Sequence, residues 1–290
     1  MADTSISELE PQATTESSLP VVVPGLAPAD IVALQEAVQA LEHPGLAARL
    51  AAIAGKPVEL LGQMLPASAS QLIATATTRG LEVALKAALR TMRGDPRTGS
   101  RLLHKALATA SGAAGGAFGL AALPVELPVS TIIMLRSIAD IARSEGEDLS
   151  DPEAVLACVQ VFALGGRAGS VDASESGYFA ARGMLAKSVT EAARFIAERG
   201  IVEEGSPVLV RFLAKVASRF GVAVTQKVAA QALPIVGALG GASVNYVFVE
   251  HFQQVARGHF IVRRLERAYG KAMVRAEYGR IAARSEQGAT

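Results

Sequence analysis

The fold class is decided by two stretches that contain no charged residue: ALATASGAAGGAFGLAALPV at residues 106–125 and VAAQALPIVGALGGASVNYVFV at residues 228–249. The twenty residues of the first would extend about 30 Å as a helix, which matches the apolar core of a bilayer. Alanine and glycine contribute little to membrane insertion, however, whereas closely spaced glycines let two helix backbones pack closely. We therefore expect a central pair of Gly/Ala-rich helices, and a membrane-inserted helical hairpin is the alternative.

The composition of the whole chain also favours helices. Hydrophobic residues make up 50% of its 290 residues, but aromatic residues make up only 4%, and there is no tryptophan. A core of small side chains suits tightly packed helices better than sheets, which draw on β-branched and aromatic residues. The charged fraction of 19% and the mean hydropathy of +0.33 indicate an unusually buried core or contact with a membrane.

Helical periodicity and turn residues predict one all-α domain, residues 28–284, between two tails. Residues 1–27 are rich in Ser, Thr, Glu and Pro, which is typical of disorder, and residues 285–290 form a C-terminal tail. The domain is expected to contain about nine to eleven helices. The first four are predicted at residues 30–41, 46–54, 58–65 and 67–92, each followed by proline or glycine.

Further along the chain, proline and capping residues set the expected boundaries. Pro124 and Pro128 are expected to break the chain, so that the next helix covers residues 129–144. Ser150 is the predicted N-cap of the helix that follows, with Pro152 in its first turn. Later helices are predicted at residues 179–199, 207–231 and 252–283, and the small polar residues 167–177 are the best candidate for a mobile loop.

The net charge is only +1, but basic residues are concentrated in two segments. Residues 79–105 carry seven basic and two acidic side chains, and residues 257–290 carry eight basic and three acidic ones. Each segment is either a solvated helix face or a surface for anionic lipid headgroups or an acidic partner. Nucleic acid is not an expected partner, because the whole chain is near neutral. The candidate membrane-contact residues are Arg257, Arg263, Arg264, Arg267, Lys271 and Arg275.

Three polar residues in apolar surroundings, Glu126, Arg136 and Asn245, form with Asp140 the candidate ligand-binding set. A buried charge is costly without a partner, so Glu126 and Arg136 are expected to pair with each other or with Asp140. One interpretation is structural, with an ion pair and an amide that fix the register of the helices. The other is functional, with these groups at the mouth of a pocket between the Gly-rich helices. An unpaired Glu126 would favour the second interpretation.

The sequence contains no recognised catalytic motif. A nucleophile elbow, a P-loop, an HExxH zinc motif and a dinucleotide-binding glycine motif are all missing, so neither an enzymatic activity nor a cofactor is expected. An enzyme would need Glu126, Glu250 and His251 to meet in one cleft. The single cysteine, Cys158, lies in an apolar run and is expected to be a buried, inert thiol. No metal site is expected unless the fold brings the four histidines together: His43, His104, His251 and His259.

Two segments resemble a known family. LPVELPVSTIIMLRSIADIARSEGEDLSDPE, at residues 123–153, resembles the signature of the EcsC protein family, and ALPIVGALGGASVNY, at residues 232–246, is similar to its C-terminal portion. The resemblance covers about residues 31–270. It implies an intracellular bacterial protein associated with a membrane or a membrane complex, in a family named for a gene that neighbours an ABC transporter. The family provides no catalytic residues that match positions of this chain.

Together these observations predict a non-enzymatic accessory protein at the cytoplasmic face of the membrane, where residues 79–105 and 257–284 meet anionic lipid. Residues 1–18 are acidic and lack the basic start of a secretion signal, which predicts a cytoplasmic location. Together with the basic segments, this predicts a peripheral position at the inner membrane. The second hypothesis is a binding module for a lipid or another apolar ligand between the Gly-rich helices. The membrane-inserted hairpin is the alternative topology.

Overall fold

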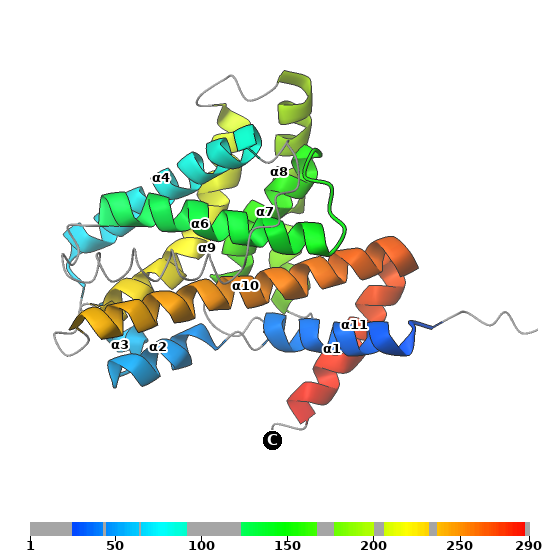
Figure 1. Ribbon diagram of the computed structural model, residues 1–290, viewed down its shortest axis with the longest axis horizontal. Helices are drawn as coiled ribbons and strands as arrows, with labels where there is room; N and C mark the ends of the chain where they lie inside the picture. Colours follow the sequence, from blue (N-terminus) through cyan, green and yellow to red (C-terminus); the bar gives the residue numbers. More distant parts are fainter. Residues whose placement is uncertain are drawn as a thin grey trace, which may run out of the picture.

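The structure is a computed structural model, and it describes residues 25–42, 45–63, 65–91, 123–166, 177–199, 206–231 and 237–287. Over these residues the regular secondary structure is entirely helical, and the helices share one hydrophobic core, which confirms the predicted all-α single domain (Figure 1). The helices are α1 (Pro28–Glu42), α2 (Leu46–Ala54), α3 (Val58–Gln63), α4 (Ala67–Thr91), α6 (Leu123–Ser144), α7 (Pro152–Gly165), α8 (Gly177–Arg199), α9 (Pro207–Gln231), α10 (Gly237–Tyr269) and α11 (Lys271–Gln287).

The long helix α10 passes through the middle of the molecule and packs on α1, α2, α6, α7, α9 and α11 (Figure 1). Its buried side carries Phe248 and Phe252. Their rings form a cluster with Phe162 of α7 and Phe220 of α9, in which neighbouring ring centroids are between 4.7 and 6.1 Å apart. These few large side chains fill the centre of a core that otherwise consists mainly of Ala, Val and Leu.

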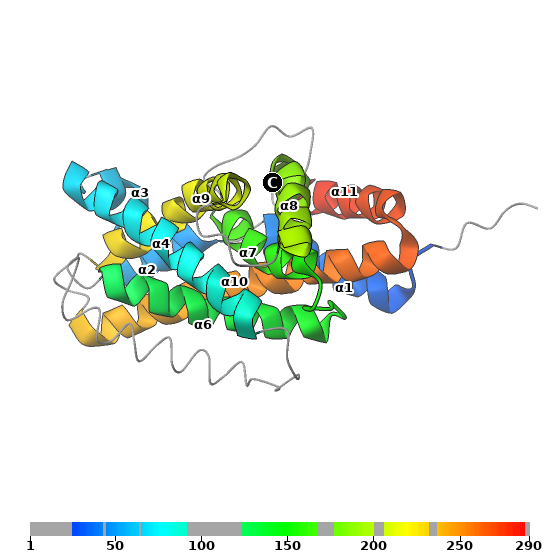
Figure 2. The same cartoon turned by 90° about the horizontal axis from the view of Figure 1, so that it is seen from above.

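Helices α6 and α10 lie side by side and run in the same direction (Figures 1 and 2). Gln253 Nε2 donates to Ser137 Oγ at 2.5 Å, and Arg263 Nε donates to Glu147 Oε1, just after α6, at 2.8 Å. Both pairs are 116 residues apart in the chain. A residue of α6 therefore lies beside the residue about 116 positions later in α10.

Helix α4 crosses α6 at a glycine. A Cβ atom at Gly80 would lie 3.2 Å from Thr131 Oγ1 and 3.6 Å from the carbonyl group of Leu127. The missing side chain lets the two backbones approach closely, as small residues do at helix crossings. Helix α6 thus packs on both α4 and α10, and it lies between them in the view of Figure 1.

The course of α6 shows that the predicted break at Pro124 and Pro128 is wrong, because the helix runs through both prolines. Pro124 lies in the first turn, where backbone N–H groups have no helical acceptor, so its ring costs no hydrogen bond. Pro128 removes one helical hydrogen bond. Leu123, Leu127 and Thr131 are buried in the core and offset this loss by holding the segment in place.

Two other predicted boundaries are wrong. The N-cap of α7 is Asp151, whose side chain accepts from Glu153 N at 2.9 Å, because Pro152 occupies the first helical position and the cap must directly precede it. The helix predicted at residues 252–283 is divided between α10, which already begins at Gly237, and α11. Gly270 has a φ of 85°, a conformation that other residues rarely adopt, and it separates α10 from α11. The remaining helices match their predicted ranges within a few residues.

Several predictions fall on residues outside the described part of the chain. These are most of the first uncharged stretch, the middle of the second at 232–236, the tail up to residue 24 and the polar segment 167–176. The central pairing of two Gly/Ala-rich helices therefore stays a prediction. Among the described helices, none combines the length and the apolar character needed to cross a membrane.

Candidate functional site

Glu126, the charge in α6 that the sequence singled out, is buried, with 6% of its side chain exposed. Its partner is Lys227 of α9, which is 1% exposed and donates from Nζ to Glu126 Oε1 at 2.7 Å. The same Nζ lies 5.3 Å from the ring centroid of Phe248 in α10. The expected pairing of Glu126 with Arg136 or Asp140 is therefore wrong. Because Glu126 is paired, the structural interpretation is favoured: this ion pair ties α6 to α9 and α10.

The other three predicted ligand-binding residues lie in different surroundings. Arg136 is exposed on α6. Asp140 forms an ion pair at 3.2 Å with Arg143, three residues later in the same helix. Asn245 is fully buried near the start of α10. The pocket that the structure describes, beside His251, is lined by none of the four predicted ligand-binding residues.

Two of the predicted membrane-contact residues, Arg263 and Arg267, bind a carboxylate inside the protein instead. Arg263 donates to both carboxylate oxygens of Glu147, at 2.8 and 3.0 Å, and Arg267 contacts the same carboxylate. Burial opposes the ionisation of Glu147, but the hydrogen bonds and charges of the two arginines hold its pKa below the ordinary value. These contacts fasten the turn between α6 and α7 to α10.

A third predicted membrane-contact residue, Arg264, fastens the N-terminal helix. It donates to Asp30 of α1 at 3.0 Å and to Glu145 at 2.9 Å. The hydroxyl of Tyr269 also donates to Asp30, at 2.7 Å. The hydrogen bonds from Tyr269 and Arg264 lower the pKa of Asp30. This arginine is therefore engaged between α1, the turn after α6 and α10.

The remaining predicted membrane-contact residues, Arg257, Lys271 and Arg275, are exposed. Lys271 and Arg275 belong to α11, and the guanidinium carbon of Arg275 lies 5.3 Å from the ring centroid of Phe179. Arg257 belongs to α10, next to α6. Membrane contact by any of the predicted residues stays a prediction.

Exposed apolar residues gather beside Arg136 and Arg257. On α6, Val125, Val129 and Arg136 recur at spacings of four and seven, so they share one side of the helix. Val125 is 72% exposed and Val129 is 44% exposed. On α10, Tyr246, which is 41% exposed, shares a side with Arg257 three turns later. The register of the two helices places Tyr246 beside residue 130 of α6, close to Val129.

Helix α4 extends this surface on the other side of α6. Its exposed residues Arg79, Val83 and Arg90 recur at spacings of four and seven, adjacent to the side on which Gly80 meets α6. The resulting surface, which we call the α4–α6–α10 face, consists of four exposed apolar and four exposed basic residues: Val83, Val125, Val129, Tyr246, Arg79, Arg90, Arg136 and Arg257.

The carboxylates of α6 and α10 do not neutralise the positive charge of the α4–α6–α10 face. Every carboxylate of α6 and α10 is already paired with a basic side chain: Glu126 with Lys227, Asp140 with Arg143, Glu250 with Arg49 and Glu266 with Arg182. On α4, the exposed Glu82 lies three residues after Arg79, so one carboxylate borders the face on that helix. Within the described chain, the four arginines of the face form no ion pair.

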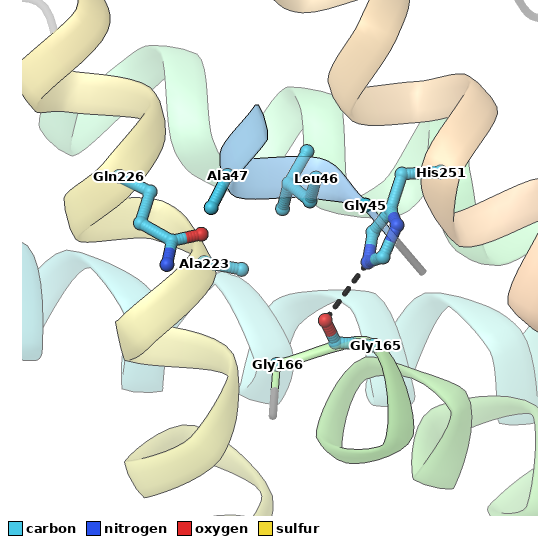
Figure 3. Close-up of a pocket in the computed structure, with 8 residues that line it drawn as sticks. All are labelled: Gly45, Leu46, Ala47, Gly165, Gly166, Ala223, Gln226 and His251. Atoms are coloured by element: carbon cyan, nitrogen blue, oxygen red, sulfur yellow. Dashed lines mark hydrogen bonds between the residues drawn. The ribbon is translucent and has the colours of Figure 1, made fainter. Parts of the chain in front are cut away.

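A pocket of about 120 Å³ lies elsewhere, where α2, α7, α9 and α10 meet (Figure 3). His251 lines it, and its Nε2 lies 2.8 Å from the carbonyl oxygen of Gly165, so Nε2 carries the proton. Pockets for drug-sized ligands measure about 300 Å³ or more, so this one is too small for an acyl chain. Its lining residues are Gly45, Leu46, Ala47, Gly165, Gly166, Ala223, Gln226 and His251.

His259 belongs to a buried polar group between α8 and α10. Its Nδ1 lies 2.9 Å from the hydroxyl of Tyr178, and the nearby Arg182 donates to Glu266 at 2.8 and 2.7 Å. Burial, together with the charges of Arg182 and Arg263, lowers the pKa of His259 well below its ordinary value. Burial raises the pKa of Tyr178 to about 12. Both side chains are therefore uncharged at neutral pH, and their contacts tie α8 to α10.

The residues that an enzyme would need do not meet among the described residues. Glu126, Glu250 and His251 have different partners, which are Lys227, Arg49 and a backbone carbonyl. No group of three or more His, Cys, Asp or Glu side chains in the described chain is placed to hold a metal ion, and His43 and His104 lie outside it. Cys158 is buried, as predicted, and burial raises the pKa of its thiol.

Sequence reasoning missed Lys227 and the α4–α6–α10 face. Lys227 stands at the boundary of the second uncharged stretch. A single lysine next to a run of alanine and valine could have indicated a buried partner for Glu126. Nothing in the sequence indicates that residues 79–90 and Arg257 belong to neighbouring parts of the molecule, because only the packing of α4 and α10 on α6 joins them.

Comparison with known proteins identifies the chain at the level of its family. The model of the EcsC protein family matches residues 29–265. The match runs from α1 into the last turns of α10, contains every residue of the α4–α6–α10 face and leaves out α11. No curated protein and no solved structure matches the chain. The resemblance drawn from residues 123–153 and 232–246 is thereby confirmed.

Proposed function

We propose that this chain, which belongs to the EcsC protein family, is a non-enzymatic accessory protein that binds the anionic cytoplasmic face of a membrane through its α4–α6–α10 face. One observation carries the proposal. Exposed basic residues of both basic segments, Arg79 and Arg90 of α4 and Arg257 of α10, belong to helices that pack on α6, which carries the exposed Arg136.

The magnitudes suit reversible membrane binding. A basic side chain near an anionic membrane surface contributes about 1 kcal/mol, so four arginines contribute roughly 4 kcal/mol at low salt. Since about 1.4 kcal/mol corresponds to a tenfold change in affinity, removal of all four is expected to weaken binding by a hundredfold or more. The arginines bound to Glu147, Asp30 and Glu145 are expected to add little, because their charges are already compensated.

The other predicted functions stay predictions. Binding of a lipid between the two Gly-rich helices and insertion of these helices as a hairpin both involve residues outside the described part of the chain. The pocket beside His251 is built by other elements. A link to an ABC transporter is implied by the family name alone.

Flotation with phosphatidylglycerol-rich vesicles tests the proposal. We expect the purified protein to float at low salt, to float less as salt screens the charges, and to stay behind with pure phosphatidylcholine vesicles. The test variant combines Arg79→Gln, Arg90→Gln, Arg136→Gln and Arg257→Gln, and it should lose binding.

The control variant removes the same number of charges outside the face: Lys187→Gln, Arg194→Gln, Lys271→Gln and Arg284→Gln. All four residues are exposed, on α8 and α11. The control should float like the unmodified protein. Equal losses in both variants would show that total charge rather than the α4–α6–α10 face binds lipid, and absence of flotation by the unmodified protein would contradict the proposed function.

A further inference from the structure

We propose that three exposed apolar side chains of the α4–α6–α10 face, Val125, Val129 and Tyr246, enter the headgroup layer of the anionic membrane while the arginines contact lipid phosphates. This inference rests on the proposed function and adds the orientation of the bound protein. Helices α6 and α10 would lie along the membrane plane.

The apolar and basic residues occupy the same order on both helices. Val129 precedes Arg136 by seven residues, which is about 10 Å along α6, and Tyr246 precedes Arg257 by eleven residues, which is about 16 Å along α10. Because α6 and α10 run in the same direction, both apolar groups lie at one end of the surface and both arginines lie toward the other. We call these residues of α6 and α10, Val125, Val129, Arg136, Tyr246 and Arg257, the strip.

An anionic lipid surface matches the strip because it has phosphates for the arginines and an apolar layer for the valines and the tyrosine. It presents phosphates to the arginines and an apolar layer some 5–10 Å beneath them, into which the apolar face of an interfacial helix enters. Tyrosine is typical of this layer, because its ring is apolar and its hydroxyl stays near water. The carboxylates of α6 and α10 do not oppose the contact, since each is paired within the protein.

The test uses the absence of tryptophan from the chain. Val129→Trp introduces a single fluorophore on the face, and Met184→Trp places one at a residue of α8 that is 57% exposed. On addition of phosphatidylglycerol vesicles, emission of Trp at position 129 should shift to shorter wavelength and be quenched by lipids with brominated acyl chains. Emission from position 184 should change little.

A second variant, Val125→Glu with Val129→Glu, measures the contribution to binding. Both residues are exposed, so folding should be preserved, and circular dichroism checks this. Vesicle affinity is expected to fall by about tenfold or more, since apolar surface is lost and negative charge is added. The matched control, Met184→Glu, should bind within about twofold of the unmodified protein.

The outcomes separate the inference from the function on which it rests. If the unmodified protein floats but the fluorophore at position 129 is neither shifted nor quenched, binding is purely electrostatic and the inference is wrong. If the unmodified protein does not float, the proposed function itself fails. If light scattering shows a dimer that the two glutamates dissociate, the strip is an interface between two copies of the chain, which also overturns the inference.

Discussion

The charged residues on the inner and outer sides of α6 and α10 lie in contrasting environments. On the inner side Glu126 is paired with Lys227, and at the end of the helices Glu147 is paired with Arg263. On the outer side Arg136 and Arg257 are exposed. The comparison teaches that charge counted along a helix does not assign a role. Burial and the nearest carboxylate decide whether an arginine or a lysine holds neighbouring helices together or remains available to a partner.

The largest expected effect comes from breaking the inner side at Lys227. Lys227→Met leaves the carboxylate of Glu126 buried without its partner, so the free energy of unfolding should fall by about 3–5 kcal/mol. Urea denaturation followed by circular dichroism measures the change. The double variant Glu126→Gln with Lys227→Met should recover most of the loss, because no charge is left buried. A loss below about 1 kcal/mol for the single variant would show that this pair does not stabilise the fold.

A smaller loss of stability is expected at Glu147, which lies at the end of the inner side. Glu147→Gln removes the carboxylate that binds Arg263 and Arg267, and it should lower the free energy of unfolding by about 1–3 kcal/mol. Glu153 provides the matched control, because its side chain is 52% exposed and its Oε1 lies 3.9 Å from Nη1 of Arg263, which is too far for a hydrogen bond. Glu153→Gln should change stability by less than about 0.5 kcal/mol. Equal effects of the two changes would contradict the role assigned to Glu147.

The buried histidine predicts a dependence of stability on pH. Because the pKa of His259 in the folded protein is well below its ordinary value, the unfolded chain binds a proton near pH 6.5 that the folded protein does not bind. This contribution to stability is complete above that pH. It should be lost as pH falls below it, by at most about 1.4 kcal/mol per pH unit.

The matching variant isolates this histidine from the other titrating groups. Urea denaturation at several pH values between about 7 and 5 should show a shallower loss for His259→Gln than for the unmodified protein. The carboxyl groups with lowered pKa, those of Glu147 and Asp30, also cost stability in acid, but they are common to both proteins. If the stability of the two proteins falls equally with pH, His259 takes up its proton in the folded protein, which would contradict the lowered pKa.

The smallest effect on stability is expected on the outer side. Arg136→Gln and Arg257→Gln, alone or together, should change the free energy of unfolding by no more than about 0.5 kcal/mol, because neither side chain is buried. Thermal and urea denaturation of the same samples check this. A loss above about 1 kcal/mol would place these arginines among the residues that hold the fold.

Local signals in the sequence predicted most helices, and long-range packing accounts for the errors. Proline and glycine mark the ends of α1, α2 and α3, because their backbone restrictions act within a few residues. The same rule fails at Pro128, where burial of neighbouring leucines outweighs one lost hydrogen bond. The boundary between α10 and α11 at Gly270 was not predicted, because the left-handed conformation of this glycine depends on how α11 packs back on α1 and α10.

The candidate site was predictable only in part for the same reason. A carboxylate in an apolar helix drew attention to Glu126, but its partner comes from a helix 101 residues away. The basic segment after residue 257 was recognised, yet the engagement of Arg263 and Arg264 depends on carboxylates more than a hundred residues earlier in the chain. Spacing along one helix carries no information about such contacts.

The most direct test of the central claim compares two pairs of charges for their effect on membrane affinity. The dissociation constant for phosphatidylglycerol-rich vesicles is measured at low salt for Arg136→Gln with Arg257→Gln, and for Lys187→Gln with Arg194→Gln. The loss of two arginines from the α4–α6–α10 face should weaken binding by roughly thirtyfold, while the loss of two charges from α8 should leave it within about twofold. Equal dissociation constants for the two variants would contradict the claim that this face binds the membrane.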